Sequence, residues 1–347
     1  MVIVHVAAFP AFANPTGNRY NALLSSALQR LNVTVDEWAP ALWPRRVDII
    51  HVHWPEVPLN IARPSHAAVR SAQTLESLIA SKAQGARVVW TAHNVRSHLH
   101  RRPRAERLYT TVFDRLVDGW IALTETSAEL ALAAHPALAG KPCVVTPHGH
   151  YRGAYPDDVS RDIARARFGL DDRHRVAVFV GLIRAYKGVD TLVEVFTSLP
   201  DPDVRLLIGG RCDDAALAEH LRAAARSDPR ITLRLEAIAD DELQCWLRAS
   251  DVTVLPYRTL LNSGTALLSL SFDVPILCPA VGSLVELADE LPAWVRVYDG
   301  DLTPSLLRDA LHQPPPPGRP DLRRYDWEEV ARQTLGLYRR LLSETAP

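Results

Sequence analysis

Short apolar runs that alternate with helical patterns constrain the fold of this chain more than any other feature of its sequence. Each run ends at a glycine, a proline or a polar residue, and apolar residues then recur at helical spacing. This order is typical of parallel sheets, because a parallel neighbour needs a crossover connection, usually a helix. The expected strands are 2–8, 47–52, 86–92, 119–123, 143–146, 176–180, 204–208, 231–235, 252–256 and 275–278.

These strands fall into two sets, separated by a polar stretch at 152–160 that is typical of a linker. We therefore predict an α/β fold with two Rossmann-like, doubly wound parallel-sheet domains that face a cleft. The predicted N-terminal, acceptor-binding domain is 1–155, and the C-terminal, nucleotide-sugar-binding domain is 156–325. A helix at 326–347 is expected to pack back toward the first domain.

The composition excludes several classes of protein. A formal net charge of -1 predicts no general attraction to nucleic acid. The four cysteines have no paired spacing, which argues against a zinc site or a disulfide framework. Neither half has Gly-x-Gly-x-x-Gly after its first strand, so a dinucleotide oxidoreductase is disfavoured. No apolar run approaches the ~20 residues of a membrane-spanning helix, and we expect a cytoplasmic protein.

Two basic residues follow the first strand of the second half. Arg184 and Lys187 stand between a glycine at 181 and a helical pattern that starts near 189. A helix start carries free N–H groups and partial positive charge, so two cations there favour a diphosphate. The alternative is that both are solvated loop charges.

A second stretch of the same half predicts another anion site. Asn262, Ser263, Gly264 and Thr265 precede an apolar helical run. Asn262 or Ser263 can cap that helix, and Gly264 lets backbone N–H groups approach a phosphate closely. Two anion sites in one domain favour a nucleotide diphosphate more strongly than either does alone.

The candidate catalytic groups lie at strand ends in the first half. Glu56 lies just past the strand at 47–52, and His93 ends the strand at 86–92. A histidine there could act as a base or donate a hydrogen bond to substrate, or be a satisfied structural residue. His51 and His53 alternate onto one face, but no third ligand has convincing spacing for a metal.

The segment Arg96–Arg107 is the one dense basic run of the sequence. It could contact anionic lipid headgroups, which would place the protein peripherally on the inner face of the plasma membrane. It could also hold an acidic acceptor. The alternative is an ordinary solvated face.

Taken together, these motifs resemble those of the GT-B glycosyltransferases, in particular the family 4-like clan. The likeness extends along nearly the whole chain. The matching pieces are 48–53, Pro147-His148-Gly149, 180–190, 249–256, 273–275 with 282–286, and Asp326-Trp327-Glu328.

The resemblance implies a role for each matched position. Arg184 and Lys187 would bind the donor diphosphate, with Asn262, Ser263, Gly264 and Thr265 assisting. The remaining implied contacts are nucleoside binding by Arg211, Ala237, Ile238 and Ser269, and acceptor binding by Gly17, Asn18 and Asn94. The family needs no metal and no cofactor besides the nucleotide-diphosphate sugar as co-substrate.

One departure concerns stereochemistry. Retaining members carry two glutamates eight positions apart, where this chain has Leu260 and Leu268. The pieces His-x-His-Trp-Pro-Glu, Thr-Ala-His-Asn and Asn-Ser-Gly look more like bacterial inverting β-mannosyltransferases of exopolysaccharide assembly. Inversion needs a base that deprotonates the acceptor hydroxyl, for which Glu56, His93 and Glu125 are the candidates.

The sequence thus predicts metal-independent, inverting transfer of a hexose from a GDP- or UDP-sugar. The acceptor would be a hydroxyl of a saccharide or lipid-linked acceptor, as in polysaccharide biosynthesis, although a soluble natural product is an alternative. Two further alternatives are a GT-B-like sugar-nucleotide epimerase and a non-catalytic sugar-nucleotide-binding regulatory protein. Donor binding without turnover would favour the regulatory protein.

Overall fold

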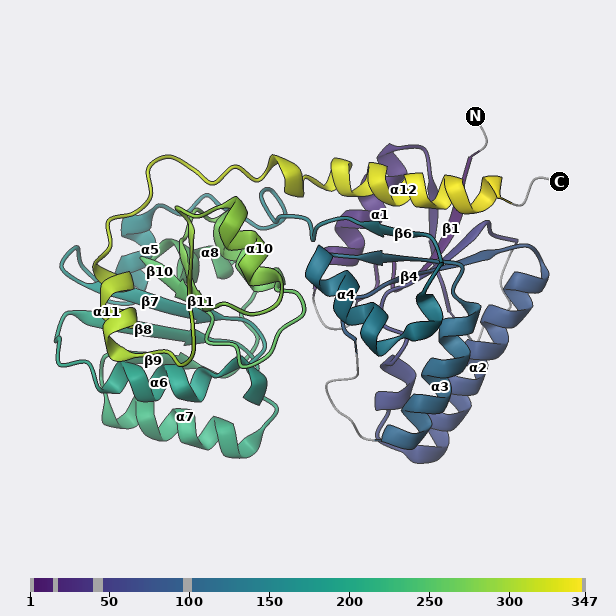
Figure 1. The fold of residues 1–347 in the computed structure, drawn as a ribbon. Helices are drawn as coiled ribbons and strands as arrows, with labels where there is room; N and C mark the ends of the chain where they lie inside the picture. The colour runs from purple at the N-terminus through teal and green to yellow at the C-terminus, as the bar shows by residue number, and fades with distance from the viewer. Residues whose placement is uncertain (1–2, 15–17, 40–45, 96–101, 345–347) are drawn as a thin grey trace. The chain divides into compact units, whose positions relative to one another are not determined.

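The chain divides into two compact units in a computed structural model that describes residues 3–14, 18–39, 46–95 and 102–344 (Figure 1). The first unit combines residues 1–149 with 323–347, and the second is 150–322. Within the described residues, each unit contains one six-stranded sheet in which all paired strands are parallel. The predicted α/β fold with two doubly wound parallel sheets is confirmed.

The sheet of the first unit has the strand order β2-β1-β3-β4-β5-β6. Its strands are β1 (His5–Phe9), β2 (Thr34–Glu37), β3 (Ile49–Val52), β4 (Arg87–Thr91), β5 (Gly119–Ala122) and β6 (Cys143–Val145). Its helices are α1 (Tyr20–Arg30), α2 (Pro64–Ala83), α3 (Pro103–Leu116), α4 (Glu125–Ala134) and α12 (Trp327–Ser343). Three short 3₁₀ turns complete it, namely η1 (Val57–Asn60), η2 (Pro136–Leu138) and η4 (Arg323–Tyr325).

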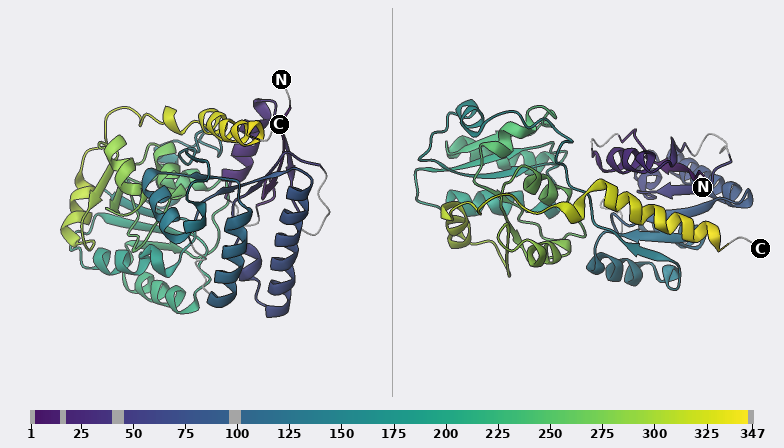
Figure 2. Two further views of the ribbon diagram at one scale, coloured as in Figure 1. Left: turned by 45° about the vertical axis from the view of Figure 1, so that its right-hand side comes forward. Right: turned by 90° about the horizontal axis from the view of Figure 1, so that it is seen from above.

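Both faces of the middle of this sheet are buried, which explains why its central strands β1, β3, β4 and β5 are mostly apolar. Helices α1 and α12 cover one face through residues such as Leu24 and Tyr338. Helices α2 and α3 cover the other face through Leu78 and Phe113. Figure 2 shows α12, in yellow, running beside the strands of the first unit. Helix α12 packs against this sheet through a large buried face. The strands of the sheet precede α12 in the sequence by nearly two hundred residues or more.

The sheet of the second unit has the strand order β12-β11-β10-β7-β8-β9. Its strands are β7 (Arg175–Val180), β8 (Val204–Gly209), β9 (Ile231–Arg234), β10 (Val252–Val254), β11 (Ile276–Pro279) and β12 (Val295–Tyr298). Its helices are α5 (Arg161–Arg167), α6 (Val189–Thr197), α7 (Ala215–Ser227), α8 (Leu243–Arg248), α9 (Gly264–Ser271), α10 (Ser283–Glu290) and α11 (Pro304–His312), with the 3₁₀ turn η3 (Ala185–Lys187).

Several elements were not expected from the sequence. Strand β12 extends the second sheet past β11, where the sequence predicted its end. Strand β2 is only four residues long and has one fully buried residue, so its pattern is weak. Helix α3 begins within the basic segment, at Pro103, and Tyr109 and Phe113 bury one of its faces while Arg104 and Arg107 are exposed.

Candidate functional site

The predicted diphosphate turn lies at the carboxyl end of β7, in the middle of the second sheet. Gly181 directly follows the last residue of the strand, and its φ of +121° belongs to the region that glycine adopts most readily. A Cβ atom at Gly181 would lie 3.3 Å from the Thr265 hydroxyl oxygen and 3.7 Å from the Lys187 ammonium nitrogen. The space beside Gly181 therefore faces both predicted anion-binding stretches at once.

The Lys187 side chain is half-buried, and its ammonium group lies near two aromatic rings. Its nitrogen lies 5.9 Å from the ring centre of Phe179 and 5.6 Å from that of Tyr257. Burial, with a further contribution from the charge of Arg184, lowers the pKa of Lys187 to about 8. A desolvated cation without a full countercharge gains most from a bound anion.

Arg184 is part of a small ionic group at the same sheet edge. Its Nη2 donates to Asp213 Oδ2 at 3.2 Å, and Arg211 Nε is 3.2 Å from Asp213 Oδ1. The Arg184 side chain is 32% exposed, so a solute anion can reach it and take the place of Asp213. Asp213 thus holds two of the predicted donor-binding cations together.

Helix α9 begins at the predicted second anion site. Ser263 is its N-cap, and the Ser263 hydroxyl accepts a hydrogen bond from Ala266 N at 3.2 Å. This confirms that the stretch caps a helix. Gly264 and Thr265 form the first turn, where backbone N–H groups have no partner within the helix. Asn262 precedes the cap and is half-buried.

The two halves of this site are joined by a residue that sequence reasoning missed. Arg258 Nη1 donates to Ala185 O at 2.7 Å, and Arg258 Nη2 donates to Asp190 Oδ2 at 2.6 Å. Its backbone N–H donates to Tyr186 O at 2.8 Å. A Cβ at Gly188 would lie 2.0 Å from Pro256 O, so glycine is required for this approach. The sequence signal that could have identified Arg258 is its position just past β10, at the same edge of the sheet.

The residues implied to bind the nucleoside have different surroundings. Arg211 is bound to Asp213, as described above, and Ala237 is exposed. Ile238 fills the space that Gly209 leaves open: a Cβ atom at Gly209 would lie 2.4 Å from the Cδ1 atom of Ile238. The Ser269 hydroxyl is buried and donates to Thr265 O at 3.0 Å, within its own helix.

In the first unit, His93 belongs to a cluster of imidazole rings. His53 Nδ1 is 3.1 Å from His93 Nε2, and the His93 ring stacks on Trp54 with 4.8 Å between ring centres. His51 bonds to Thr91 Oγ1 at 2.7 Å and to the Tyr338 hydroxyl at 2.6 Å. The structure brings the predicted His51 and His53 together with His93.

Burial dominates the electrostatics of this cluster. It lowers the pKa of His51 to about 3 and that of His148 to about 4. The pKa values of His53 and His93 are also lowered well below the usual range, by burial first and by neighbouring histidines second. These imidazoles are therefore neutral at physiological pH, and His93 is a weak base there.

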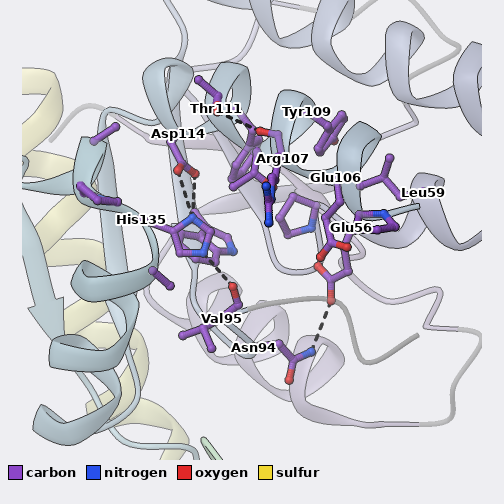
Figure 3. Close-up of a pocket in the computed structure, with 18 residues that line it drawn as sticks. Glu56, Leu59, Asn94, Val95, Glu106, Arg107, Tyr109, Thr111, Asp114 and His135 are labelled. Carbon is purple, nitrogen blue, oxygen red and sulfur yellow. Dashed lines mark hydrogen bonds and ion pairs between the residues drawn. The ribbon is translucent and has the colours of Figure 1, made fainter. Parts of the chain in front are cut away.

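Glu56 and Asn94 lie together in a separate pocket of the first unit, which we call the α3 pocket (Figure 3). Asn94 Nδ2 donates to Glu56 Oε1 at 3.3 Å. The pKa of Glu56 is raised to about 7, chiefly by burial; the charge of Glu106 acts in the same direction, and the hydrogen bond from Asn94 acts against it. The lining residues are Pro55, Glu56, Leu59, Trp90, Asn94, Val95, Pro103, Glu106, Arg107, Tyr109, Thr110, Thr111, Phe113, Asp114, Ala134, His135, Pro136 and Ala137.

A buried contact between Asp114 and His135 in this pocket was also missed from the sequence. His135 Nδ1 is 3.0 Å from both carboxylate oxygens of Asp114, and His135 Nε2 is 2.9 Å from Val95 O. A carbonyl oxygen only accepts, so Nε2 carries a proton that it donates to Val95. The two residues stand 21 positions apart in different elements, and nothing in the sequence links them.

The remaining candidates of the first unit are more peripheral. Glu125 is exposed in the first turn of α4, next to the N-cap Thr124. Asn18 Oδ1 accepts a hydrogen bond from Tyr20 N at 2.9 Å, which helps start α1. Gly17 lies outside the described residues, as do residues 96–101 of the predicted basic segment.

Two features are absent from the described part of the chain. There, no group of three or more histidine, cysteine, aspartate or glutamate side chains is arranged to hold a metal ion. None of the helices described is both long enough and apolar enough to cross a membrane.

Comparison with known proteins relates both units to one group of enzymes. The family model of glycosyl transferases group 1 matches residues 174–311. A GDP-mannose:glycolipid 4-beta-D-mannosyltransferase of Xanthomonas campestris pv. campestris is 32% identical over 291 residues, which are 82% of this chain and 77% of that protein.

Solved structures agree on the fold. Sucrose-phosphate synthase from Thermosynechococcus elongatus superposes with a TM-score of 0.72 at 17% identity, over 99% of this chain and 100% of that one. A glycosyltransferase from Rickettsia africae superposes with a TM-score of 0.65 at 12% identity, over 99% of both chains.

Proposed function

This chain belongs to the GT-B glycosyltransferases of the family 4-like clan, and from that premise we propose that it transfers a hexose from a GDP-sugar, or in second place a UDP-sugar, to a hydroxyl of a saccharide or lipid-linked acceptor. GDP-mannose is the first donor to test, because the relative that matches 82% of the chain is named for it. Transfer proceeds with inversion and without a metal ion.

The observation that carries this proposal is the space beside Gly181, bounded by the Lys187 ammonium and the Thr265 hydroxyl. The leaving diphosphate gains negative charge as its bond to the sugar breaks. Lys187, Arg184 and the first-turn N–H groups of α9 offer the positive charge that this step needs. Arg211 leaves its contact with Asp213 and binds the nucleotide instead. Ala237, Ile238 and Ser269 lie near the nucleoside.

The base is supplied by the first unit. Glu56 is the best supported of the three candidates, because a pKa of about 7 suits a general base near neutral pH. It takes the proton of the acceptor hydroxyl, whose oxygen forms the new bond to the anomeric carbon on the side opposite the diphosphate. His93 is a weaker base, and Glu125 is exposed on the surface.

Replacing the half-buried Lys187 tests the donor site. Lys187→Ala is expected to lower turnover by about 10²–10³, since losing one preorganised contact to developing charge costs about 3–4 kcal/mol. Initial rates with GDP-mannose measure this loss. The exposed Arg226 of the same unit, changed to Ala, is the matched control and keeps wild-type rates. A fully active, folded Lys187→Ala enzyme would disprove the donor assignment.

The stereochemistry is tested independently of any variant. GDP-α-mannose should give a β-linked product, and proton NMR of the anomeric signal reads the configuration directly. An α-linked product would show retention and exclude the proposed single displacement, while leaving the donor site unaffected.

The proposed membrane contact uses the described part of the basic segment. Arg104 and Arg107 are exposed on α3, whereas Arg102 donates to Leu59 O at 2.5 Å and to Ala62 O at 2.8 Å. Exposed arginines near an anionic surface each add about 1 kcal/mol of attraction. Sedimentation with anionic vesicles should therefore fall for Arg104→Glu, and vesicles of neutral lipid should bind neither protein.

A further inference from the structure

The chain passes between the two units twice, after residue 149 and after residue 322. Residues 150–155 start the second unit and form the first connecting segment, and residues 313–322 end that unit and form the second. Neither segment contains a helix or a strand, and Figure 1 shows the second one running from α11 toward α12. Side-chain contacts must therefore hold both segments to the second unit.

One carboxylate at the end of helix α9 binds both connecting segments. Asp273 Oδ1 accepts from Arg152 Nη2 at 3.0 Å and from Arg319 Nε at 3.1 Å, and Oδ2 lies 3.0 Å from the same Arg319 Nε. Arg152 belongs to the first segment and Arg319 to the second. The Asp273 side chain is 17% exposed, so water screens its ion pairs less than it screens pairs on the open surface.

Further hydrogen bonds join the two segments to each other and to α9. Arg152 Nη2 also donates to Pro320 O at 3.0 Å, which links the first segment directly to the second. Tyr151 N donates to the Ser271 hydroxyl at 2.8 Å, and that hydroxyl donates to Leu267 O at 2.6 Å within α9. The last turn of α9 is thus bonded to the backbone of the first segment.

The backbone of Asp273 indicates that its carboxylate has a purpose beyond ending the helix. Its φ of +60° lies in the left-handed region, which is unfavourable for a residue with a Cβ atom. Val274 N donates to Ser269 O at 3.0 Å, one of the bonds of the turn that ends a helix at a left-handed residue. Glycine fits that position best, so the turn alone does not explain an aspartate.

A third arginine makes the negative charge of Asp273 more important. Arg248 Nη1 lies 3.8 Å from Asp273 Oδ2, and Arg248 also binds both carboxylate oxygens of Asp157, at 2.8 and 2.6 Å. Without the charge of Asp273, three guanidiniums would repel one another around a neutral site. Both connecting segments would also lose their ion pair with Asp273.

Helix α9 begins with the predicted diphosphate-binding residues and ends at this cluster. Ser263 caps its start, and Asp273 follows its C-cap residue Phe272. The helix has eight residues, which corresponds to a length of about 12 Å. The transfer proposed above uses this helix start in the second unit and a base in the first. Its geometry therefore depends on how the connecting segments are held.

We propose that Asp273 is a positioning residue for glycosyl transfer, whose carboxylate attaches both connecting segments to the end of α9 through Arg152 and Arg319. This inference rests on the proposed function and adds to it a residue outside the donor site and the candidate bases. Asp273 affects the rate of transfer and not donor binding, because its side-chain partners are not among the residues proposed to bind the donor.

Replacing Asp273 by glycine in the full-length protein is the main test. Asp273→Gly removes the carboxylate and supplies the residue that the left-handed position accepts most easily. Amide hydrogen exchange should become about tenfold faster in residues 150–155 and 319–322, because both segments open more easily. In the initial-rate assay with GDP-mannose, kcat should fall about 10- to 100-fold, since small misplacements of reacting groups have effects of this size.

The KM for GDP-mannose and the Kd for GDP should stay within about twofold of wild type, because a donor site formed by the second unit alone is unchanged. A merely structural role of Asp273 would lower the free energy of unfolding but would not lower kcat alone in the folded protein. Calorimetry with GDP and urea denaturation complete the comparison.

Two further variants keep the test decisive if Asp273→Gly does not fold. Arg319 is 58% exposed, so Arg319→Gln leaves the core intact. It should speed exchange in residues 319–322 more than in 150–155 and lower kcat less than Asp273→Gly does. Asp203→Asn is the matched control, because it removes another paired carboxylate of the second unit, 3.7 Å from Arg173, and should behave like wild type.

Several outcomes would overturn this inference. They are a wild-type kcat in Asp273→Gly, unchanged exchange in both segments, or a loss of GDP affinity as large as the loss in kcat. If only Arg319→Gln folds, its kcat and its exchange decide in the same way. Absence of GDP binding by wild type would instead contradict the proposed function, and the positioning role would fall with it. The exchange data would then still show whether Asp273 holds the two segments.

Discussion

At the scale of single residues, Lys187 is the group whose chemistry depends most on what is bound. Its ammonium lies within 6 Å of the centres of two aromatic rings, and burial lowers the pKa of this lysine to about 8. A diphosphate beside it would raise that pKa again, because an opposite charge favours the protonated form. If Lys187 binds the donor diphosphate as we propose, ligand binding and proton uptake are coupled at this residue.

This coupling gives a pH prediction. Below pH 8 the lysine is already charged, and above pH 8 it must take up a proton when the nucleotide binds. We expect GDP affinity to fall as pH rises from about 8 to about 10, by up to tenfold per pH unit once the lysine is neutral. Calorimetry in two buffers of different ionisation enthalpy measures the proton uptake.

Lys187→Arg supplies the control, because arginine stays protonated throughout this range. Its GDP affinity, even if lower, should be nearly independent of pH between 8 and 10. A wild-type affinity that does not change over the same range would mean that Lys187 does not contact the diphosphate.

At the scale of elements, the turn after β7 and the loop before α9 are held together by Arg258. Its guanidinium binds Ala185 O and Asp190 Oδ2, and the side chain of Asp190 is only 27% exposed. The turn carries Lys187 and the loop leads to Ser263, so the Arg258 contacts set the spacing of the two predicted anion-binding stretches. We therefore expect Arg258 to act as a positioning residue.

Removing the Arg258 side-chain contacts should affect donor binding more than the free energy of unfolding. For Arg258→Ala we expect the KM for GDP-mannose to rise about tenfold, since a lost charged hydrogen bond costs about 1.5–3 kcal/mol. The free energy of unfolding should change by less than about 1 kcal/mol, because the side chain is about half exposed. Steady-state kinetics and urea denaturation measure the two effects.

Arg258→Lys keeps the charge but cannot bind Ala185 and Asp190 together as the planar guanidinium does. A KM between those of wild type and Arg258→Ala is expected for it. Equal KM values for all three proteins would show that the Arg258 contacts have no part in donor binding.

At the scale of the molecule, the buried histidines determine how the first unit responds to acid. His51 and His148 have pKa values of about 3 and about 4 in the folded state, well below the ordinary value of 6.5. Between about pH 4 and pH 6.5, these histidines bind more protons in the unfolded chain than in the folded one. The free energy of unfolding therefore falls as pH decreases from about 6.5 toward 4. Each such histidine contributes up to about 1.4 kcal/mol per pH unit.

Urea denaturation followed by tryptophan fluorescence from pH 7 to pH 4 checks this dependence. His148→Gln retains a donor for the backbone oxygen that His148 binds but does not titrate. The variant should lose stability less steeply with acid than wild type. Parallel curves for the two proteins would show that His148 is not excluded from water in the folded state.

Much of this architecture follows from the sequence alone. The strand runs, the turn with Arg184 and Lys187 after β7, and the Ser263 cap of α9 depend on residues close together in the chain, so local spacing reveals them. The family follows from the same pieces. The role of each site residue in catalysis remains a prediction.

Only the tertiary structure decided which distant residues meet. Asp114 with His135, Arg258 with Asp190, and Tyr338 with His51 are paired by the packing of separate elements, and no local pattern encodes such pairs. Burial likewise determines that the pKa of Glu56 rises and that of Lys187 falls. Desolvation depends on everything that surrounds a group, and those surroundings exist only once the chain has folded.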